Sequence, residues 1–480
     1  MSIESSENLN CLGDTAKHLE SPRQRPALNS SREVEIRHEA PFYKTLSAPI
    51  SVQVEMTETC NLSCSHCYNS WRREPFAYTT LSRNRLLETL EQIKRNNIFE
   101  VVLTGGEPFL FKENVVEAVQ CLNENSIGCS VNTNLTTMSE ENAFKLKEAG
   151  VRRILTSLMS FNEETHDRMT QKKGSFQKTI RGIKNVVVAQ IPLVAHMVIC
   201  RANENDIYKT GSFVADLGVR AFAATKVSPA PGNLRFSEMG LSRESVKRSL
   251  ETLLVLQKKL GLRTDILECY PLCLIGDAQK FRRFARRRCT AGITTAVIGA
   301  NGNLRPCIHL NEVAGNIFKE GLQESWRRMD HWRNGSLIPD TCQECQHLRE
   351  CTAGCRAEAQ YFGNITDMDP YASLPEDVLV PPERKSITMS QSRDFLQEKL
   401  KVNPNLRIRL ESFGGIASGK MGSYVFLNRD SYGLIEGLSR DEVVFSVLEI
   451  SQSYNFQPEQ ALEFFTHLYN EEVVMKEQIR

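Results

Sequence analysis

The stretch Met56-Thr57-Glu58-Thr59-Cys60-Asn61-Leu62-Ser63-Cys64-Ser65-His66-Cys67-Tyr68 places three cysteines in one short loop. Three thiolates hold three corners of a cubane iron–sulfur cluster, and a closed cluster needs four ligands. The missing fourth ligand leaves one iron able to bind a small molecule. The alternatives are a zinc site and three unrelated core thiols. A structural zinc site usually takes four protein ligands, however, and this loop contains no fourth cysteine.

A second motif, Thr104-Gly105-Gly106-Glu107-Pro108, follows the next β-branched run of the chain. Glycines expose backbone groups to a ligand without a Cβ in the way, and the Glu107 carboxylate is able to accept a hydrogen bond from an ammonium group. The alternative is an ordinary strand-to-helix turn, because Pro108 suits the first position of a helix.

Together the two motifs resemble the radical S-adenosylmethionine (SAM) enzymes, which share the Cys-x3-Cys-x2-Cys spacing and a GGEP motif. The resemblance implies that Cys60, Cys64 and Cys67 hold a four-iron cluster whose open iron chelates SAM. One electron from an external donor of the flavodoxin or ferredoxin type then splits SAM, and the resulting 5′-deoxyadenosyl radical abstracts hydrogen from a substrate.

The resemblance also implies a set of residues around SAM. Weaker matches at later strand ends add an asparagine, a serine and an arginine, each of which is also typical of turns and helix caps. The expected cofactor-binding residues are His66, Gly105, Gly106, Glu107, Pro108, Asn134, Ser157 and Arg168.

The composition is that of an ordinary folded protein in a reducing compartment. The chain has 480 residues, enough for two or three domains, and its 41% hydrophobic residues indicate a sizeable core. The net charge of +1 gives no general attraction to nucleic acid or to an acidic membrane. Its 15 cysteines are closely spaced, which suits metal ligands better than disulfides. We find neither a signal peptide nor a membrane span, so we expect a cytoplasmic protein with no nucleic-acid or membrane partner.

From residue 51 onward, β-branched runs alternate with amphipathic stretches. The expected strands are 52–56, 99–104, 129–132, 153–157, 193–200 and 220–226, and the expected helices are 82–95, 112–124, 139–148, 172–188 and 205–217. Strict alternation predicts a parallel sheet with right-handed crossovers. The six units are too few for a closed eight-fold barrel. We therefore expect an α/β fold, a partial (β/α)6 TIM barrel with its chemistry at the carboxyl ends of the strands.

Six more cysteines lie between residues 289 and 355 and form the second cysteine field, the first being the loop with Cys60, Cys64 and Cys67. Their pattern is Cys289-x12-Gly302-x4-Cys307 followed by Cys342-x2-Cys345-x5-Cys351-x3-Cys355. This resembles the SPASM extension of radical SAM enzymes, found mainly in maturases of peptides and proteins, and implies one or two auxiliary four-iron clusters. In that family's interleaved ligation the two sets of metal ligands are Cys289, Cys307 and Cys355, and Cys342, Cys345 and Cys351. The alternative is a four-cysteine zinc site over residues 342–355.

The family's seventh cysteine is absent from this chain. Ala372 stands where it is expected, and no cysteine follows Cys355. Each auxiliary cluster would then have three thiolates from the field itself. Cys269 or Cys273 would be available to close the first cluster.

The second cluster is left with three possibilities. It takes a non-thiolate ligand such as Asp367 or Asp369, it keeps an open iron able to bind a substrate thiolate, or it is absent.

The last part of the chain reads as a linker and a small module. Residues 373–395 carry three prolines among polar residues. Beyond them we expect a strand at 406–410, a hairpin turn in the glycine-rich 414–422, a returning strand at 424–427, and helices marked by apolar residues within 443–450 and 461–468. This arrangement suggests a winged helix and resembles the PqqD-like element that captures a leader peptide as an added strand.

DNA binding is the competing interpretation of that module. Residues 401–480 carry 8 Lys/Arg against 11 Asp/Glu, a net charge of −3, whereas a phosphate-binding module should be basic. The charge therefore favours a peptide.

The sequence predicts a chain of five parts, which are a tail at 1–45, the partial barrel at 46–240, bridging helices with the SPASM region at 241–372, the linker at 373–395 and the PqqD-like module at 396–480. The resemblances imply a radical SAM/SPASM enzyme that modifies a ribosomally synthesised precursor peptide with a leader, by a crosslink, thioether, epimerisation or excision. The alternatives are a maturase of a folded protein or cofactor, similar to sulfatase-maturing enzymes, and a non-catalytic, metal-stabilised winged-helix regulator.

Overall fold

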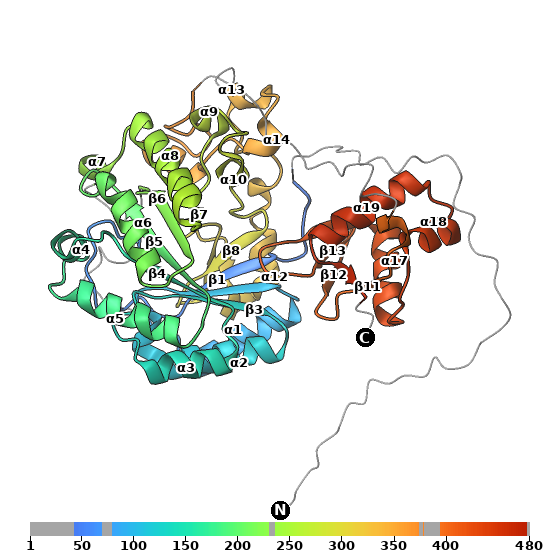
Figure 1. Ribbon diagram of the computed structural model, residues 1–480, viewed down its shortest axis with the longest axis horizontal. Coiled ribbons are helices and arrows are strands. Elements are labelled where there is room, and N and C mark those ends of the chain that lie inside the picture. The colour runs from blue at the N-terminus through green and yellow to red at the C-terminus, as the bar shows by residue number, and fades with distance from the viewer. Residues whose placement is uncertain (1–42, 70–78, 230–235, 374–377, 379–393, 478–480) are drawn as a thin grey trace, which may run out of the picture. The chain divides into compact units, whose positions relative to one another are not determined.

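A mostly parallel sheet organises the chain, as a computed structural model shows for residues 43–69, 79–229, 236–373, 378 and 394–477 (Figure 1). The sheet has ten strands in the order β10-β9-β8-β1-β2-β3-β4-β5-β6-β7. The strands are β1 (Ser51–Glu55), β2 (Glu100–Thr104), β3 (Gly128–Asn132), β4 (Arg153–Ser157), β5 (Leu193–Ile199), β6 (Ala221–Lys226), β7 (Arg263–Asp265), β8 (Thr295–Ile298), β9 (Asn303–Arg305) and β10 (Gly315–Asn316). Only the pairings of β9 are antiparallel.

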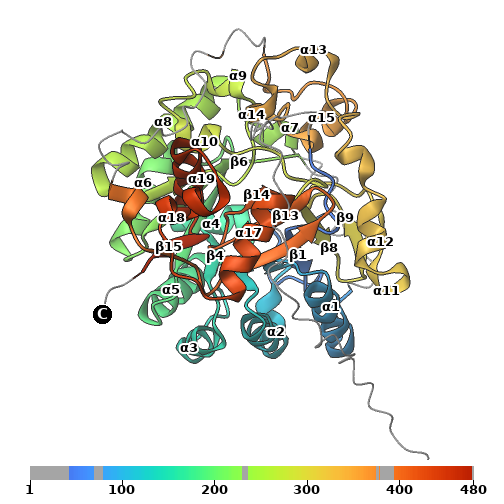
Figure 2. The same cartoon turned by 90° about the vertical axis from the view of Figure 1, so that its right-hand side faces the viewer.

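Helices fill the crossovers between the parallel strands. They are α1 (Arg83–Arg95), α2 (Lys112–Glu124), α3 (Glu140–Ala149), α4 (Glu163–Thr170), α5 (Ser175–Val188), α6 (Ile207–Asp216), α7 (Phe236–Met239) and α8 (Arg243–Leu260). Figure 2 shows α1, α2, α3 and α5 side by side along one face of the sheet. The predicted partial barrel of six strand–helix units is confirmed. Strands β7 to β10 were not predicted, because they are at most 4 residues long and too short to show a period.

Local sequence explains where these helices begin and end. The side chain of Ser82 accepts a hydrogen bond from the Arg85 amide and caps α1, and Ser242 caps α8 in the same way. Gly261 ends α8 with φ of 64°, a left-handed conformation that glycine adopts without strain.

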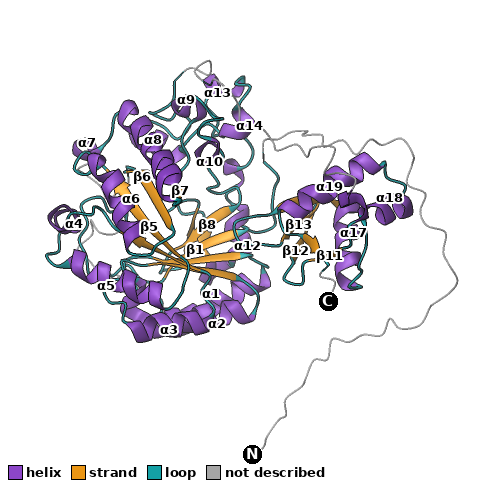
Figure 3. Ribbon diagram, in the orientation of Figure 1, coloured by secondary structure: helices purple, strands orange, loops and turns teal. Residues whose placement is uncertain are grey.

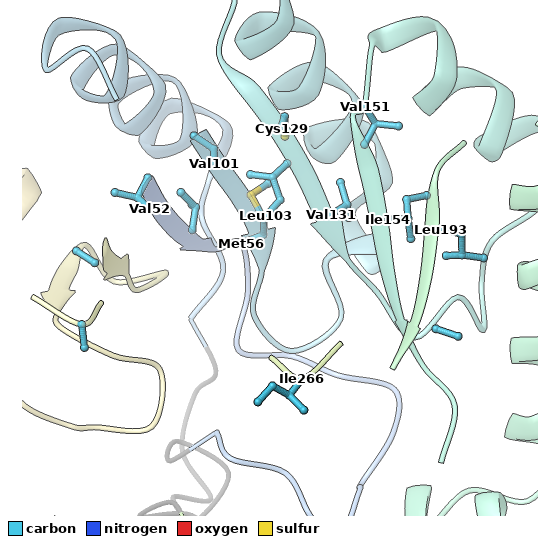
Figure 4. Packing of buried hydrophobic residues seen from close by; sticks show 14 of the residues in the cluster. Val52, Met56, Val101, Leu103, Cys129, Val131, Val151, Ile154, Leu193 and Ile266 are labelled. Atoms are coloured by element: carbon cyan, nitrogen blue, oxygen red, sulfur yellow. The ribbon is translucent and has the colours of Figure 1, made fainter. Parts of the chain in front are cut away.

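The core lies between the sheet and these helices. Figure 4 shows apolar side chains of neighbouring strands in contact, among them Val52, Val101, Val131 and Ile154. All four side chains are fully buried, with 0% relative exposure. Burying side chains of this size stabilises the fold by roughly 1.5–3 kcal/mol each, so the strand ends above this layer have a rigid base.

Short helices connected by loops follow α8 along the chain, before and after the last strands of the sheet (Figure 3). They are α9 (Leu272–Ile275), α10 (Arg282–Ala285), α11 (Ile317–Glu320), α12 (Leu322–Arg327), α13 (Asp340–Gln343), α14 (Leu348–Cys351) and α15 (Arg356–Phe362). This segment contains the whole second cysteine field. Short elements of this kind have little core of their own, which is typical of a region held together by metal ligands.

In the described part of the C-terminal module, two small sheets are accompanied by the helices α17, α18 and α19. Its elements are β11 (Leu400–Val402), β12 (Arg407–Glu411), β13 (Gly414–Ser418), β14 (Val425–Asn428), α17 (Arg429–Arg440), α18 (Val447–Tyr454), α19 (Pro458–Asn470) and β15 (Val474–Lys476). Strands β12, β13 and β14 form an antiparallel meander, and β11 pairs with β15. The strands expected at 406–410 and 424–427 are therefore confirmed.

The hairpin turn predicted over the glycine-rich 414–422 is wrong, because Gly414–Ser418 is the central strand of the meander. Its glycines serve close packing. A Cβ at Gly415 would lie 2.0 Å from the ring of Tyr432, on α17. The helix thus lies directly on the strand.

The apolar residues Val443 and Val444 were expected in a helix and precede it instead. Helix α18 begins at Val447 because Ser446 and Glu449 form a capping box, in which each side chain accepts from the other residue's amide. That signal is visible in the sequence and fixes the helix start better than the apolar run does.

None of the helices in the described part of the chain is long and apolar enough to cross a membrane. The predicted tail at 1–45, with Cys11, and the linker at 373–395 lie almost wholly outside the described residues.

Candidate functional site

The cysteine loop leaves the carboxyl end of β1 and is fixed by backbone hydrogen bonds. The Cys67 amide donates to the Cys64 carbonyl oxygen at 3.2 Å, and the Ser65 amide donates to the carbonyl oxygen of Met169, on α4, at 2.9 Å. Cys60, like the other two cysteines, is half-buried. The loop therefore presents three thiols from a defined backbone at the strand ends.

The glycine pair after β2 brings a second loop against the cysteine loop. The Gly106 amide donates to the Thr57 carbonyl oxygen at 2.6 Å, and the Glu107 amide donates to that of Thr59 at 2.8 Å. A Cβ at Gly106 would lie 2.1 Å from the Thr59 carbonyl oxygen, and Gly105 has φ of 128°. The glycines are thus required for contact between the two loops.

Replacing Gly106 with alanine should displace the cysteine loop. A backbone oxygen 2.1 Å from the new Cβ has to move with its neighbours, at a cost of about 1–3 kcal/mol. We expect a lower thermal midpoint and fewer irons retained per chain after anaerobic desalting. Gly437→Ala is the matched control, because nothing lies within 4 Å of its Cβ. Equal iron retention in both variants would contradict this prediction.

Glu107 is a buried carboxylate engaged by the next strand. It accepts hydrogen bonds from the Thr133 hydroxyl at 2.6 Å and from the amides of Asn134 at 2.7 Å and Phe109 at 2.9 Å. Burial raises the pKa of Glu107, and these hydrogen bonds act in the opposite direction. A carboxylate has about four acceptor sites, so one remains for the ammonium donor that the sequence analysis expects there.

Asn134 connects β3 to the cysteine loop. Its side-chain nitrogen Nδ2 donates to the Asn61 side-chain oxygen at 2.9 Å, and the Asn61 side-chain nitrogen in turn donates to the Thr136 hydroxyl at 2.8 Å. The structure therefore gives Asn134 a positioning role, and its expected contact with SAM stays a prediction.

The other expected SAM residues are spread around the same strand ends. Ser157 ends β4, beside His196 on β5. Arg168 is exposed on the last turn of α4, next to the residue that contacts the cysteine loop. His66 is half-buried within the cysteine loop, and Pro108 begins the 3-10 helix η2 (Pro108–Phe111).

Eight cysteines form two groups in the structure. They are the six cysteines of the second field together with Cys269 and Cys273, which precede it in the chain. In the first group, the Cys269 thiol lies within hydrogen-bonding reach of Cys289 and Cys355. The Cys307 thiol lies near enough to the same two residues to interact with them electrostatically. Members of the first group are Cys269, Cys289, Cys307 and Cys355. In the second, four cysteine side chains line one small cavity. Members of the second group are Cys273, Cys342, Cys345 and Cys351. None of the eight forms a disulfide.

The aspartates considered as ligands have other roles. Asp369 is 2% exposed, and its two oxygens accept from the Cys355 amide at 2.7 Å and the Tyr371 amide at 2.8 Å. Asp367 is exposed and accepts from the Asn364 amide at 2.7 Å. Asp369 thus orients the backbone at Cys355, and neither aspartate is among the residues that line the cavity of the second group.

A buried ion pair joins the barrel to the second cysteine field. Lys226, the last residue of β6, pairs with Glu358 on α15, and both side chains are at most 1% exposed. The Ser228 hydroxyl donates to Glu358 at 3.1 Å, and Glu268 lies 3.9 Å from the Lys226 ammonium. We call these four residues and His309 the Lys226 network. This network was not predicted from the sequence, although Lys226 stands at the carboxyl end of a barrel strand, where functional residues of such barrels lie.

The network reaches the cysteine loop through a stacked pair of rings. Tyr68, directly after Cys67, stacks on His309 with ring centroids 5.1 Å apart and an interplanar angle of 10°. The His309 amide donates to the Cys307 sulfur at 3.4 Å, and its ring nitrogen lies 3.5 Å from Glu268. The two cysteine fields are therefore connected through one pair of side chains.

Burial keeps the histidines of this region neutral. It lowers the pKa of His196 to about 4 and also lowers the pKa of His309. Two buried ring nitrogens, His196 Nε2 and His309 Nδ1, and one carboxylate oxygen, Glu358 Oε2, have no hydrogen-bond partner among the described residues. Unpaired buried polar atoms of this kind are costly unless a ligand or water satisfies them, so the region suits a polar substrate group.

The cysteine chemistry fits iron–sulfur clusters. Two groups of four thiols and one loop of three supply the donor atoms that such clusters take. The three-cysteine loop lies where the carboxyl ends of the barrel strands meet, as expected for a reactive centre.

Comparisons with known proteins agree with this chemistry. Residues 54–214 match the model of the radical SAM superfamily. Residues 289–356 match the model of the SPASM iron–sulfur cluster-binding domain.

The chain is also similar to individual proteins over 68% of its length. The chain is 26% identical over 343 residues to the AdoMet-dependent heme synthase of Methanosarcina barkeri, which covers 68% of this chain and 96% of that protein. It is 27% identical to the mycofactocin maturase MftC of Mycolicibacterium smegmatis, over 68% of this chain and 82% of that protein. The crystal structure of Streptococcus suis SuiB bound to its precursor peptide SuiA has a TM-score of 0.55 at 18% identity, over 68% of this chain and 76% of that chain.

The likeness to SuiB shows a common fold, and the two domain models account for both cysteine fields. The chain therefore carries a radical SAM domain over residues 54–214 and a SPASM iron–sulfur cluster-binding domain over residues 289–356.

Proposed function

We propose that this enzyme modifies a ribosomally synthesised precursor peptide in the reducing cytoplasm. SAM bound at a four-iron cluster supplies a 5′-deoxyadenosyl radical that removes a hydrogen atom from the peptide. Cys60, Cys64 and Cys67 would hold that cluster. The observation that carries the proposal is the combination of this loop with eight further thiols in two groups of four. The mycofactocin maturase MftC, which is similar to this chain over 68% of its length, supports a peptide as the substrate.

The Lys226 network would handle the reacting part of the peptide. It lies between the cysteine loop and the first group of cysteines, connected to both through Tyr68 and His309. Its neutral histidine, His309, is able to accept a hydrogen bond, as is His196 near Glu268. Lys226 with Glu358 supplies charge in a dry environment. An electron donor of the flavodoxin or ferredoxin type would reduce the cluster from outside.

The C-terminal module would bind the leader. Its meander β12–β13–β14 ends at β14, an edge strand that suits addition of an extended peptide, and residues 401–480 have a net charge of −3. Tethering the leader raises the local concentration of the reacting residues, so that weak contacts near the radical suffice. In this proposal residues 396–480 form a PqqD-like element, joined by the linker at 373–395 to the SPASM region at 241–372 and the partial barrel at 46–240.

Maturation of a cofactor is the second candidate. It is favoured by the similarity to the AdoMet-dependent heme synthase of Methanosarcina barkeri. The two candidates differ in the role of the C-terminal module, because a cofactor substrate has no leader for the module to bind.

Co-expression with short peptides encoded by neighbouring genes, followed by mass spectrometry, tests the proposal. We expect the full chain to change the mass of one such peptide, by loss of two hydrogens or of a fragment, or to epimerise it without a mass change. Deleting residues 396–480 should weaken binding of that peptide at least about 10-fold, while dithionite-driven cleavage of SAM persists.

Two results would count against the proposal. Full activity on the peptide after the deletion would show that the C-terminal module does not tether the peptide. Modification of a tetrapyrrole or another cofactor, with no peptide altered, would favour the second candidate.

A further inference from the structure

The second group of cysteines surrounds the position where a cysteine is missing. One small cavity is lined by Cys273, Cys342, Cys345 and Cys351, and Ala372 lines the same cavity. Three of these thiols belong to the pattern that the SPASM model matches, whereas Cys273 comes from α9, outside the matched range. A thiol from a different part of the chain thus occupies the space next to Ala372.

Local contacts hold the Cys273 thiol in that place. The Ser373 amide, directly after Ala372, donates to the Cys273 sulfur at 3.3 Å. The Leu272 amide donates to the Cys351 sulfur at 3.4 Å, which joins α9 to α14. Backbone N–H donors to sulfur favour the thiolate form that a metal ligand requires.

The backbone carbonyl of Cys273 is held from two sides as well. It accepts from the Ser373 hydroxyl at 3.2 Å and from the Arg243 guanidinium at 3.5 Å. Arg243 also donates to the Ser373 hydroxyl at 2.9 Å. These contacts fix α9 against residues 372–373, so a side chain on either segment reaches the same cavity.

The remaining upstream thiol is already engaged elsewhere. Cys269 lies against Cys289 and Cys355 in the first group. Cys269 and Cys273 are separated by a turn that begins at Pro271, and the two thiols serve different groups. Each group therefore has four sulfurs of its own, and no aspartate is needed to complete either of them.

We propose that Cys273 is the fourth thiolate of the second auxiliary cluster and replaces the cysteine that is absent at position 372. The cluster is then closed by Cys273, Cys342, Cys345 and Cys351. The expectation that it lacks a fourth thiolate, and the open iron for a substrate thiolate that followed from it, are superseded. A closed cluster transfers electrons and offers no iron to a substrate.

The test is iron and sulfide counting with EPR of the reduced full-length protein, purified and reconstituted anaerobically. The wild-type chain should hold about twelve irons in three four-iron clusters. Cys273→Ala should lose up to about four irons, or show a new three-iron signal after oxidation. The double variant Cys273→Ala/Ala372→Cys should restore the wild-type iron content and spectrum, because residue 372 lines the same cavity. Cys121→Ala, a half-buried thiol on α2, is the control and should keep all its iron.

Three outcomes would overturn the proposal. The first is an unchanged iron content and spectrum in Cys273→Ala. The second is a deficit that Ala372→Cys does not restore, since a merely structural role of Cys273 would not be rescued from another segment. The third is stoichiometric zinc at this site in place of iron, which four thiolates also bind. None of these outcomes bears on the identity of the peptide, so this inference and the proposed function fail separately.

Discussion

Replacing Cys67 with alanine is expected to abolish cleavage of SAM, down to the level of dithionite and SAM without enzyme. Two thiolates do not hold a four-iron cluster stably, so the variant should contain about four irons fewer than the wild type. The eight thiols of the two other groups are untouched by the substitution. The protein should therefore remain brown, with reduced absorption near 400 nm, and lose the reaction entirely.

The measurement is formation of 5′-deoxyadenosine under anaerobic conditions, with iron counted on the same samples. Cys121→Ala is the control, because this thiol lies on α2, away from either cysteine field. Cleavage by Cys67→Ala at a rate near that of the control would remove the origin of the radical from this loop. Loss of all iron from the variant would instead mean that the loop supports the fold of the second cysteine field.

Much of the barrel was predictable because its elements are long and periodic. The strand from Leu193 to Ile199 is a run of apolar residues interrupted only by His196, and a short apolar run bounded by turn residues is typical of a buried strand. The strands from β7 to β10 were missed because they are too short to show a period. They form by pairing with a sheet edge that already exists. The glycine-rich strand β13 was missed for a different reason, since its glycines serve contact with the Tyr432 ring.

The candidate site divides in the same way. The cysteine loops were predictable because ligand spacing is local, and the structure adds which cysteines lie together. The role of Cys273 was not predictable, because it depends on α9 lying against residues 372–373, a contact that spans about 100 positions of sequence. The pairing of Lys226 with Glu358 spans 132 positions and left no local pattern either.

Lys226→Met is expected to cause a large loss of stability. The change removes the ammonium and keeps the volume of the side chain, so the Glu358 carboxylate is left buried without its partner. Breaking a buried pair in this way costs about 3–5 kcal/mol of the free energy of unfolding. Urea unfolding of the anaerobic protein, followed by circular dichroism, measures the loss. Because α15 follows Cys355, the same variant should also release iron from the first group more readily.

The double variant Lys226→Met/Glu358→Gln separates the charge from the packing. With both charges removed, the penalty for an unpaired buried carboxylate disappears, so the double variant should lose less than half of what the single variant loses. Lys145→Met supplies the surface comparison. Its partner Glu141 lies 2.6 Å away, yet the two side chains are 54% and 73% exposed, and an exposed pair contributes at most about 1 kcal/mol. If Lys226→Met were no more harmful than Lys145→Met, the pair would not be what joins the barrel to the second cysteine field. If the double variant were less stable than Lys226→Met alone, the Glu358 carboxylate would have a further cationic partner, and the Lys226 network would need to be redrawn around it.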